Sequence, residues 1–455
     1  MGGGLLQLVA YGAQDVVLTS NPSVTFFKTV HRRHTNFAME CISNTFSGTV
    51  EFGRTSTCTI SRNGDLVHKV YLMVTLPKPD SQLLTSANAT GQTNGNKDKL
   101  GKMWGWVRKT GHALIKDIEI EIGGQKIDKH YGEWMDIWSQ LTLPYEKKDG
   151  HATMIRGYEG DIGHELHDTT DSQGVTLYIP LQFWFCTNPG LSLPLIALQY
   201  HEVKIKVDFR DKKQMLFAQH QVNSTGDGWA YYDGTTTNDA VTKASDLFNA
   251  VTSSDISDNF EAELLVDYIY LDTDERRRFA QVSHEYLITQ LQHTGEENLT
   301  AQNNSIRLNF NHPVKELVWV TIPNEAINWN DHFQYEDCIT DDTMIDTCKL
   351  MLNGHDRFTE RKGHYFSLVQ PFQHHTCVPL SGINVYSFAL KPEDIQPSGT
   401  CNFSRIDNAT LKVNLRSDAN QIGASHEKDA KLRVFATNYN LLRIMSGMGG
   451  LAYAN

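Results

Sequence analysis

Residue types that could hold a metal ion gather at two places in the sequence. At the first, His374 and His375 stand beside Cys377, and Cys338 and Cys348 lie upstream. Zinc prefers imidazole and thiolate ligands, but structural zinc sites usually present them as two close pairs, and these spacings form no such pairs. The sequence therefore favours structural or loop roles for these residues.

The second group of potential ligands lies in a polar stretch, where imidazole and carboxylate groups could bind a divalent cation. No paired motif elsewhere completes such a site, and no pattern of outer partners would hold the ligands in place, so a solvated loop is favoured. The group comprises His151, His164 and His167 with Asp161, Glu165 and Asp168.

No catalytic motif indicates an enzyme. The chain contains no Gly-x-Ser-x-Gly turn, no phosphate-binding glycine loop and no His-Glu-x-x-His motif. We therefore predict no catalytic residue, no cofactor-binding residue and no metal ligand.

Two further features could bind other molecules. The basic run Arg276–Arg278 could contact phosphates, but acidic residues between 272 and 275 nearly cancel its charge, which favours a charged connector between domains. Five tryptophans could form a sugar-stacking platform, although core packing or burial between subunits is at least as well supported. These tryptophans are Trp104, Trp106, Trp134, Trp138 and Trp184.

Six asparagines match the Asn-x-Ser/Thr glycosylation acceptor, a motif short enough to arise by chance. Asn88 and Asn223 lie in the longest polar loops, so we expect them to be the most exposed. A protein that folds in the cytosol would not meet the host enzyme, so the sequence leaves modification open. The six positions are Asn88, Asn223, Asn298, Asn303, Asn402 and Asn408.

Composition limits the remaining function classes. The 455 residues are 40% hydrophobic, enough for a sizeable core in two or three domains. The net charge of -12 is spread without a basic block, so direct nucleic-acid binding is not expected. Seven cysteines without close pairing indicate a reducing compartment such as the cytosol. The glycine-rich start does not read as a secretory signal.

The elements that carry these residues follow an internal repeat. The strand Lys69–Pro77 resembles Lys315–Pro323, and the same order of further strands follows in both halves. The offset falls from 246 residues at the prolines that end these strands to 206 at Arg210 and Arg416. The first copy therefore carries the longer loops, with its main insertion at about 211–259.

Each copy supplies many short strands, which predicts a mainly β fold built as two consecutive sandwiches or jelly rolls. Helices are expected at Gly132–Leu141 and Thr273–Gln281, the second as a joint between the halves. An apolar segment outside both repeats indicates an arm that docks on a neighbour or on the base, and its residues are Leu5, Leu6, Leu8, Val9 and Tyr11.

Motifs along nearly the whole chain resemble the double jelly-roll major capsid proteins of nucleocytoplasmic large DNA viruses, of the chlorella virus and iridovirus type. The segments that carry the resemblance are Leu8–Asp15, Thr25–Phe37, Ile60–Leu66, Asp267–Asp272, Glu275–Ala280, Tyr386–Pro392, Gln396–Arg405 and Asn438–Leu451.

The resemblance implies an all-β chain with two eight-stranded jelly rolls and short helices in loops. It further implies a homotrimeric, pseudo-hexagonal capsomer in the icosahedral shell of a virion assembled in the host cytoplasm. The expected partners are neighbouring capsomers and minor capsid and penton proteins, with an inner membrane beneath the shell as an indirect partner and no direct nucleic acid. The alternative is a lectin-like, carbohydrate-binding β-sandwich, because jelly rolls also occur in lectins.

The expected domain organisation has five parts. They are an N-terminal arm (1–28), a first jelly roll (29–272), a helical connector (273–283), a second jelly roll (284–437) and a C-terminal tail (438–455).

Overall fold

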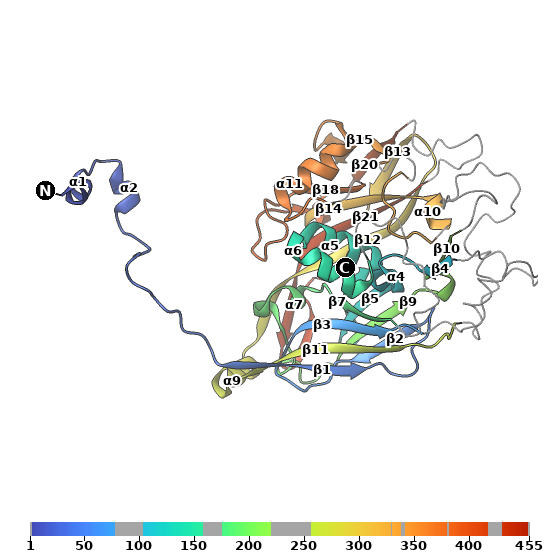
Figure 1. Cartoon of the computed structure of the whole chain (residues 1–455), viewed down its shortest axis with the longest axis horizontal. Coiled ribbons are helices and arrows are strands. Elements are labelled where there is room, and N and C mark those ends of the chain that lie inside the picture. The colour runs from blue at the N-terminus through green and yellow to red at the C-terminus, as the bar shows by residue number, and fades with distance from the viewer. Residues whose placement is uncertain are drawn as a thin grey trace, which may run out of the picture. The chain divides into compact units, whose positions relative to one another are not determined.

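The computed structural model describes residues 2–77, 103–157, 175–219, 256–328, 330–337, 342–379, 382–416 and 430–453. The chain divides into two compact units, Met1–Phe37 and Ala38–Asn455. The first unit is an arm with two short helices, α1 (Gly3–Val9) and α2 (Asp15–Thr19), neither of which buries a residue. The second unit, the body, carries the sheets (Figure 1).

The first jelly roll consists of two antiparallel sheets around one core. Alternate residues of its strands point inward, and in Val203–Phe209 every second side chain is buried, as expected for a strand with one face on a core. One sheet has the order β1 (Phe37–Thr45), β11 (Glu261–Leu271), β3 (Leu66–Thr75) and β7 (Thr176–Pro180), with β8 (Leu193–Pro194) also on β3. The other has the order β2 (Thr55–Thr59), β9 (Val203–Phe209), β5 (Ile115–Ile122) and β6 (Gln125–Tyr131).

The second jelly roll repeats this arrangement. Its first sheet has the order β12 (His284–Leu299), β21 (Ala430–Met445), β14 (Pro313–Pro323) and β18 (Ile383–Ser387), with β19 (Cys401–Asn402) on β14 and β22 (Met448–Leu451) on β21. Its second sheet has the order β13 (Asn303–Leu308), β20 (Ala409–Leu415), β15 (Ile345–Leu352) and β16 (His355–Asp356), with β17 (Arg361–Lys362) also on β15.

The internal repeat predicted from the sequence is confirmed by the strand orders. The predicted pair Lys69–Pro77 and Lys315–Pro323 lies in β3 and β14, which occupy the same third position in corresponding sheets. In the same way β11 matches β21, β9 matches β20, and β5 matches β15. The two halves of the body are therefore two copies of one β-sandwich.

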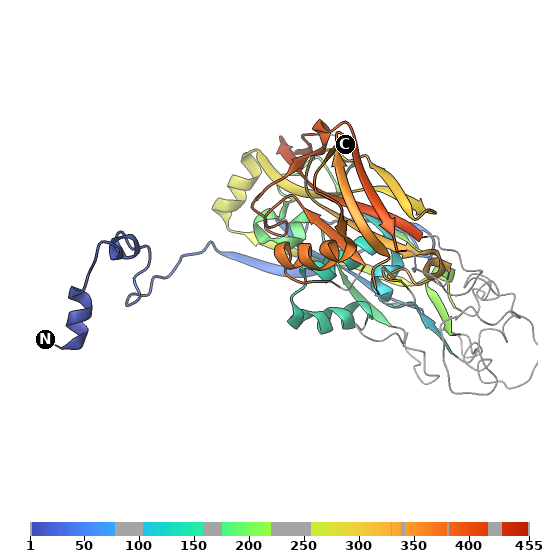
Figure 2. The same cartoon turned by 90° about the horizontal axis from the view of Figure 1, so that it is seen from above.

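Short helices lie in the connections between the strands. The two predicted helices form as α5 (Gly132–Thr142) and α9 (Thr273–Gln281), and α9 lies at one end of the body (Figures 1 and 2). Among the described residues, no helix is both long enough and apolar enough to cross a membrane. The other α-helices of the body are α4 (Thr110–Leu114), α6 (Tyr145–Ile155), α7 (Trp184–Thr187), α10 (Asn324–Asn328) and α11 (Gln370–His374).

Short 3₁₀ and π-helical turns also lie in the connections between the strands. They are the 3₁₀ turns η2 (Pro189–Leu191), η3 (Lys212–Gln214) and η5 (Phe403–Arg405) and the π-helical turn η4 (Tyr365–Val369). A separate ribbon pairs β4 (Met103–Trp106) with β10 (Leu216–Gln219). Part of the expected insertion at 211–259 is therefore a strand. This strand, β10, pairs with β4, which lies in the connection between β3 and β5.

Two expected boundaries are wrong. The arm extends to Phe37 rather than residue 28. Residues 438–445 are no tail, because β21 continues to Met445 and pairs with β12 along this length. The polar residues Asn438 and Asn440 concealed this continuation. Asn440 is nevertheless buried, and its side chain donates to the Gln290 amide oxygen at 2.9 Å.

Candidate functional site

The histidines and cysteines of the first predicted group serve as structural contacts. Nδ1 of His374 lies 3.0 Å from the Leu390 carbonyl oxygen, and the Cys377 thiol donates to the Leu143 carbonyl oxygen at 2.9 Å. Cys348 is buried in the second core, and Cys338 lies outside the described residues. No cluster of three or more metal-ligand side chains occurs in the part of the chain that the structure describes.

His375 forms a buried ionic cluster with two carboxylates. Its Nε2 lies 3.0 Å from Oε2 of Glu316, its Nδ1 lies 2.8 Å from Oε1 of Glu393, and the His375 and Glu316 side chains are 0% exposed. Burial would lower the pKa of His375, but the two carboxylates outweigh that effect and raise it to about 9. The ring is therefore a structural imidazolium at neutral pH.

The second predicted group is only partly within the described residues. His164, His167, Asp161, Glu165 and Asp168 lie outside them. His151 lies in α6 rather than in a solvated loop, so that prediction is wrong for this residue. Its ring centroid is 5.4 Å from that of His112, and burial together with this neighbour lowers the pKa of His151 to about 4.

The predicted surface features separate into exposed and buried residues. Arg276–Arg278 are exposed on α9, and Arg276 pairs with Asp65 at 3.1 Å, as expected for a charged connector. Trp106, Trp134 and Trp184 are buried, which excludes them from a sugar-stacking surface. Asn88 and Asn223 lie outside the described residues, and four acceptor asparagines are exposed: Asn298, Asn303, Asn402 and Asn408.

The most developed polar site of the body is the junction between the jelly rolls. Glu133, in the first turn of α5, lies 2.8 Å from Nη2 of Arg210 and 2.7 Å from Nη1 of Arg433 through the same oxygen, Oε1. Arg210 follows β9 of the first jelly roll, whereas Arg433 lies in β21 of the second. All three side chains are at least 85% buried, since their exposed fractions are 6%, 10% and 15%.

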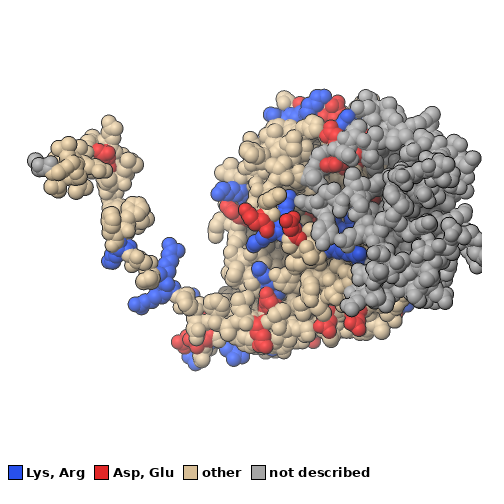
Figure 3. All heavy atoms as spheres, viewed as in Figure 1, with Lys and Arg blue, Asp and Glu red and all other residues tan. Residues whose placement is uncertain are grey.

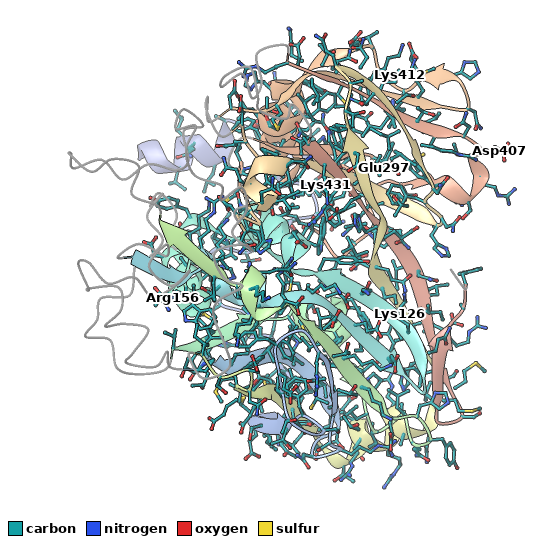
Figure 4. The ribbon with its side chains drawn as sticks, turned by 90° about the vertical axis from the view of Figure 1, so that its right-hand side faces the viewer. Lys126, Arg156, Glu297, Asp407, Lys412 and Lys431 are labelled. Atoms are coloured by element: carbon teal, nitrogen blue, oxygen red, sulfur yellow. The ribbon has the colours of Figure 1, made fainter. Side chains whose placement is uncertain are left out.

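Each carboxylate of this junction network lies between two cations. Burial would raise the pKa of Glu133, but Arg433 and Arg210 hold it well below its ordinary value. Arg433 also bonds to Glu296, which in turn pairs with Lys431 at 2.7 Å. Lys431, a residue of β21, is labelled in the upper middle of Figure 4. Glu133 is therefore ionised at neutral pH, and the network ties α5 to β21 and β12.

Aromatic packing surrounds the ion pairs. The Trp134 ring stacks on Trp138 with centroids 5.5 Å apart and contacts Phe435 at 5.4 Å. The Phe435 ring stacks on His293 at 4.7 Å, and Tyr131 meets the same histidine at 5.1 Å. Such contacts contribute beyond the buried area, so residues of both jelly rolls share one packed seam.

The first sheet of the second jelly roll packs against the cores of both jelly rolls, and we call it the shared sheet. This sheet explains why the packed seam is continuous. In β14, Trp319 faces the core of the second jelly roll, whereas Val318 and Val320 belong to the core of the first. The strand is buried on both faces, and this is why its sequence is an unbroken apolar run rather than an alternating one. The two jelly rolls therefore form one rigid block rather than two domains that move independently.

Two cavities in the described part of the body lack the free paired carboxylates that a carbohydrate-processing site would need. A cavity of about 270 Å³ borders the junction, and its three acidic residues are paired: Glu133 and Glu296 with arginine, and Asp117 with Lys129. A groove of about 630 Å³ lies between α6 and β7, and Glu146 is the one acidic residue among its described lining. A pair of free carboxylates in a cleft is thus missing from both.

The sequence did not indicate the junction network. Glu133 and Arg433 are 300 positions apart, and each looks like an ordinary surface charge in its own segment. One feature of the sequence could have pointed to the network. Glu133 stands beside Trp134 on the predicted helix, which placed a carboxylate next to the apolar face of that helix.

Comparisons with known proteins agree with this architecture. The family model described as "Major capsid protein N-terminus" matches residues 25–272, and that described as "Large eukaryotic DNA virus major capsid protein" matches residues 275–450. The chain is 48% identical to the major capsid protein of Pyramimonas orientalis virus and 40% identical to that of Paramecium bursaria Chlorella virus 1, in each case over 100% of both chains.

Solved structures give the same result. The crystal structure of PBCV-1 VP54 superposes with a TM-score of 0.72 at 36% identity, over 95% of this chain and 100% of that one. The Faustovirus major capsid protein shares the fold, with a TM-score of 0.65 at 13% identity over 96% and 94% of the two chains.

Two jelly rolls fused around a shared sheet define a double jelly-roll capsid protein. The chain belongs to the family of major capsid proteins of large eukaryotic DNA viruses, as its sequence motifs predicted. It is a structural component of the viral shell.

Proposed function

We propose that the protein assembles as a homotrimer with a pseudo-hexagonal outline, and that these capsomers tile the icosahedral shell. The observation that carries the proposal is the matched strand order of the two jelly rolls. Three chains closed around a threefold axis would present six similar walls, and a block with six walls can pack against six neighbours.

The rigid junction supports this proposal. A capsomer keeps its outline only if the two jelly rolls of a chain hold a fixed angle, and the Glu133–Arg433 pair lies between them in a packed aromatic seam. A buried ion pair has a strict geometry because a displaced charge would be left without a partner. The network therefore favours one relative orientation.

Electron microscopy of the purified protein tests the proposal. Class averages with a hexagonal outline and threefold symmetry are the expected result. Averages of an elongated single particle with two lobes would contradict it.

We further propose that the protein has no enzymatic activity. Its proposed partners are neighbouring capsomers and the minor capsid and penton proteins. We propose an indirect relation to an inner membrane and no direct contact with nucleic acid. Assembly in the host cytoplasm is supported by the cysteines, since the six in the described residues are free. Sugar analysis of the particle by mass spectrometry tests glycosylation at the four exposed acceptor asparagines.

The domain organisation that we propose uses the observed strands. The arm ends at Phe37, the first jelly roll ends at β11, α9 connects the halves, and the second jelly roll runs from β12 through β22. Limited proteolysis tests this division, with first cleavage expected in the arm and an uncut body.

A further inference from the structure

The arm carries an unusual number of exposed apolar side chains. Leu8, Val17 and Leu18 are 79%, 84% and 81% exposed, and Phe26 and Phe27 are 89% and 101% exposed. Within α1 and α2 no residue is buried. Scattered exposed apolar residues need no explanation, but a contiguous series of this kind marks an interaction segment.

The first helix of the arm is amphipathic, and a basic cluster follows further along the arm. In α1 the side chains of Leu5, Leu6, Leu8 and Val9 cover about 160° of the helix circumference, and glycine and Gln7 cover the rest. The aromatic pair Phe26–Phe27 is followed directly by Lys28 and then by His31–His34, which includes two arginines. In Figure 3 the helices of the arm are almost entirely tan, and blue side chains gather further along it.

The charge of the arm is opposite to that of the rest of the chain. Three of the 41 basic residues and one of the 53 acidic residues lie in positions 1–37, so the arm has a formal charge of +2 and the remainder of the chain has -14. No acidic residue occurs between Asp15 and Glu40. The whole-chain charge of -12 concealed this local excess of cations.

We propose that the arm binds directly to the surface of an anionic lipid bilayer, with its leucines and phenylalanines at the acyl boundary and Lys28, Arg32 and Arg33 at the lipid phosphates. Apolar residues next to an aromatic pair and a basic cluster match the requirements for interfacial binding. A direct membrane contact goes beyond the indirect one proposed above and does not depend on trimer formation.

A bilayer fits the arm better than a groove on another protein does. The apolar residues extend over two short helices and the extended segment between Ser20 and Phe27, and in α2 Val16, Val17 and Leu18 point to different sides of the helix. A protein groove would require one defined face, whereas the bilayer interface accepts apolar side chains without complementary shape. The groove of about 630 Å³ on the body also carries Lys69 and Lys147, which do not attract a basic segment.

The negative charge of the body does not oppose this binding. The arm can span up to roughly 95 Å, at about 1.5 Å per helical residue and about 3.3 Å per extended residue. Screening at physiological ionic strength removes most of the repulsion beyond about 8 Å. The arm can therefore reach a surface that the body does not approach.

Flotation of the full-length protein with vesicles tests the proposal. We expect the protein to float with vesicles of phosphatidylcholine and phosphatidylserine, and to bind at least tenfold more weakly to phosphatidylcholine alone. Replacing Lys28, Arg32 and Arg33 by Gln should weaken binding to the anionic vesicles on the order of 100-fold. The double variant Phe26→Ser, Phe27→Ser should weaken it at least tenfold.

A matched control changes two exposed apolar residues of the body, Phe372→Ser and Leu390→Ser, which are 78% and 73% exposed in the wild type. This variant should float like the wild type, and every variant should keep the wild-type melting temperature. Failure of the wild type to float, or arm variants that float like it, would overturn the proposal. So would arm-dependent growth into larger particles in lipid-free solution without any vesicle binding, because that outcome assigns the arm to a second copy of the chain.

Discussion

The Glu133 carboxylate of the first jelly roll and the Arg433 guanidinium of the second form an ion pair of 2.7 Å, with side chains only 6% and 15% exposed. The same carboxylate oxygen lies 2.8 Å from Arg210. Two cations converge on one buried anion, so a single side chain links Arg210 at the end of β9 to Arg433 in β21.

Glu133→Gln should therefore destabilise the protein strongly. The substitution leaves the buried Arg210 guanidinium without its carboxylate partner and Arg433 with Glu296 alone, and breaking a buried pair in this way costs about 3 to 5 kcal/mol. Chemical denaturation measures the loss. The matched control is Asp346→Asn, which breaks an exposed pair of 2.7 Å with Lys362 and should cost no more than about 1 kcal/mol. Equal losses in the two variants would show that the junction network is not a stabilising contact.

The buried His375 predicts a decline in stability at alkaline pH. Its pKa is raised to about 9 in the folded protein by Glu316 and Glu393, against burial, whereas an unfolded histidine titrates near 6.5. The contribution is complete below about pH 6.5, falls as the pH rises, and is lost above about pH 9, with a total of about 3 kcal/mol.

Denaturation of the wild type and of His375→Gln between pH 6 and pH 10 measures this contribution. The difference between their free energies of unfolding should shrink as the pH rises. A difference that stays constant over this range would mean that the histidine is not held as an imidazolium.

Two glycines in helices should respond to alanine in opposite directions. A Cβ atom at Gly132 would lie 2.2 Å from the His112 carbonyl oxygen and 2.3 Å from that of Ile115, so Gly132→Ala must displace backbone and should cost more than about 2 kcal/mol. Gly150 in α6 has no atom within 4 Å of this position, so Gly150→Ala should stabilise the protein by up to about 1 kcal/mol. Thermal melts distinguish the two, and the same sign for both would contradict the packing of α5 against α4.

Deletion of residues 2–23 should leave the body folded. The helices of the arm bury no residue, so the melt should remain cooperative at the wild-type temperature, while assembly into shells on an anionic membrane should be impaired. Calorimetry and electron microscopy of assembly reactions check the two parts. Loss of the cooperative transition would assign the arm to the core.

Strands with one buried face were predictable from the sequence, and so was their duplication. In Val203–Phe209 the apolar and polar residues alternate as their burial does. The continuation of β21 through Asn438 and Asn440 was not predictable, because buried asparagines look like loop residues until their hydrogen-bond partners are known. The junction network was missed for a related reason, since partners 300 positions apart leave no local pattern.

The trimer is the central claim, and the mass of the purified protein in solution tests it most directly. Permanent interfaces of this kind usually bury more than about 2,000 Å², so dilution to micromolar concentration should not dissociate the assembly. Light scattering coupled to size exclusion should give three times the chain mass of 51.4 kDa. A mass of one or two chains at micromolar concentration would contradict the proposed capsomer.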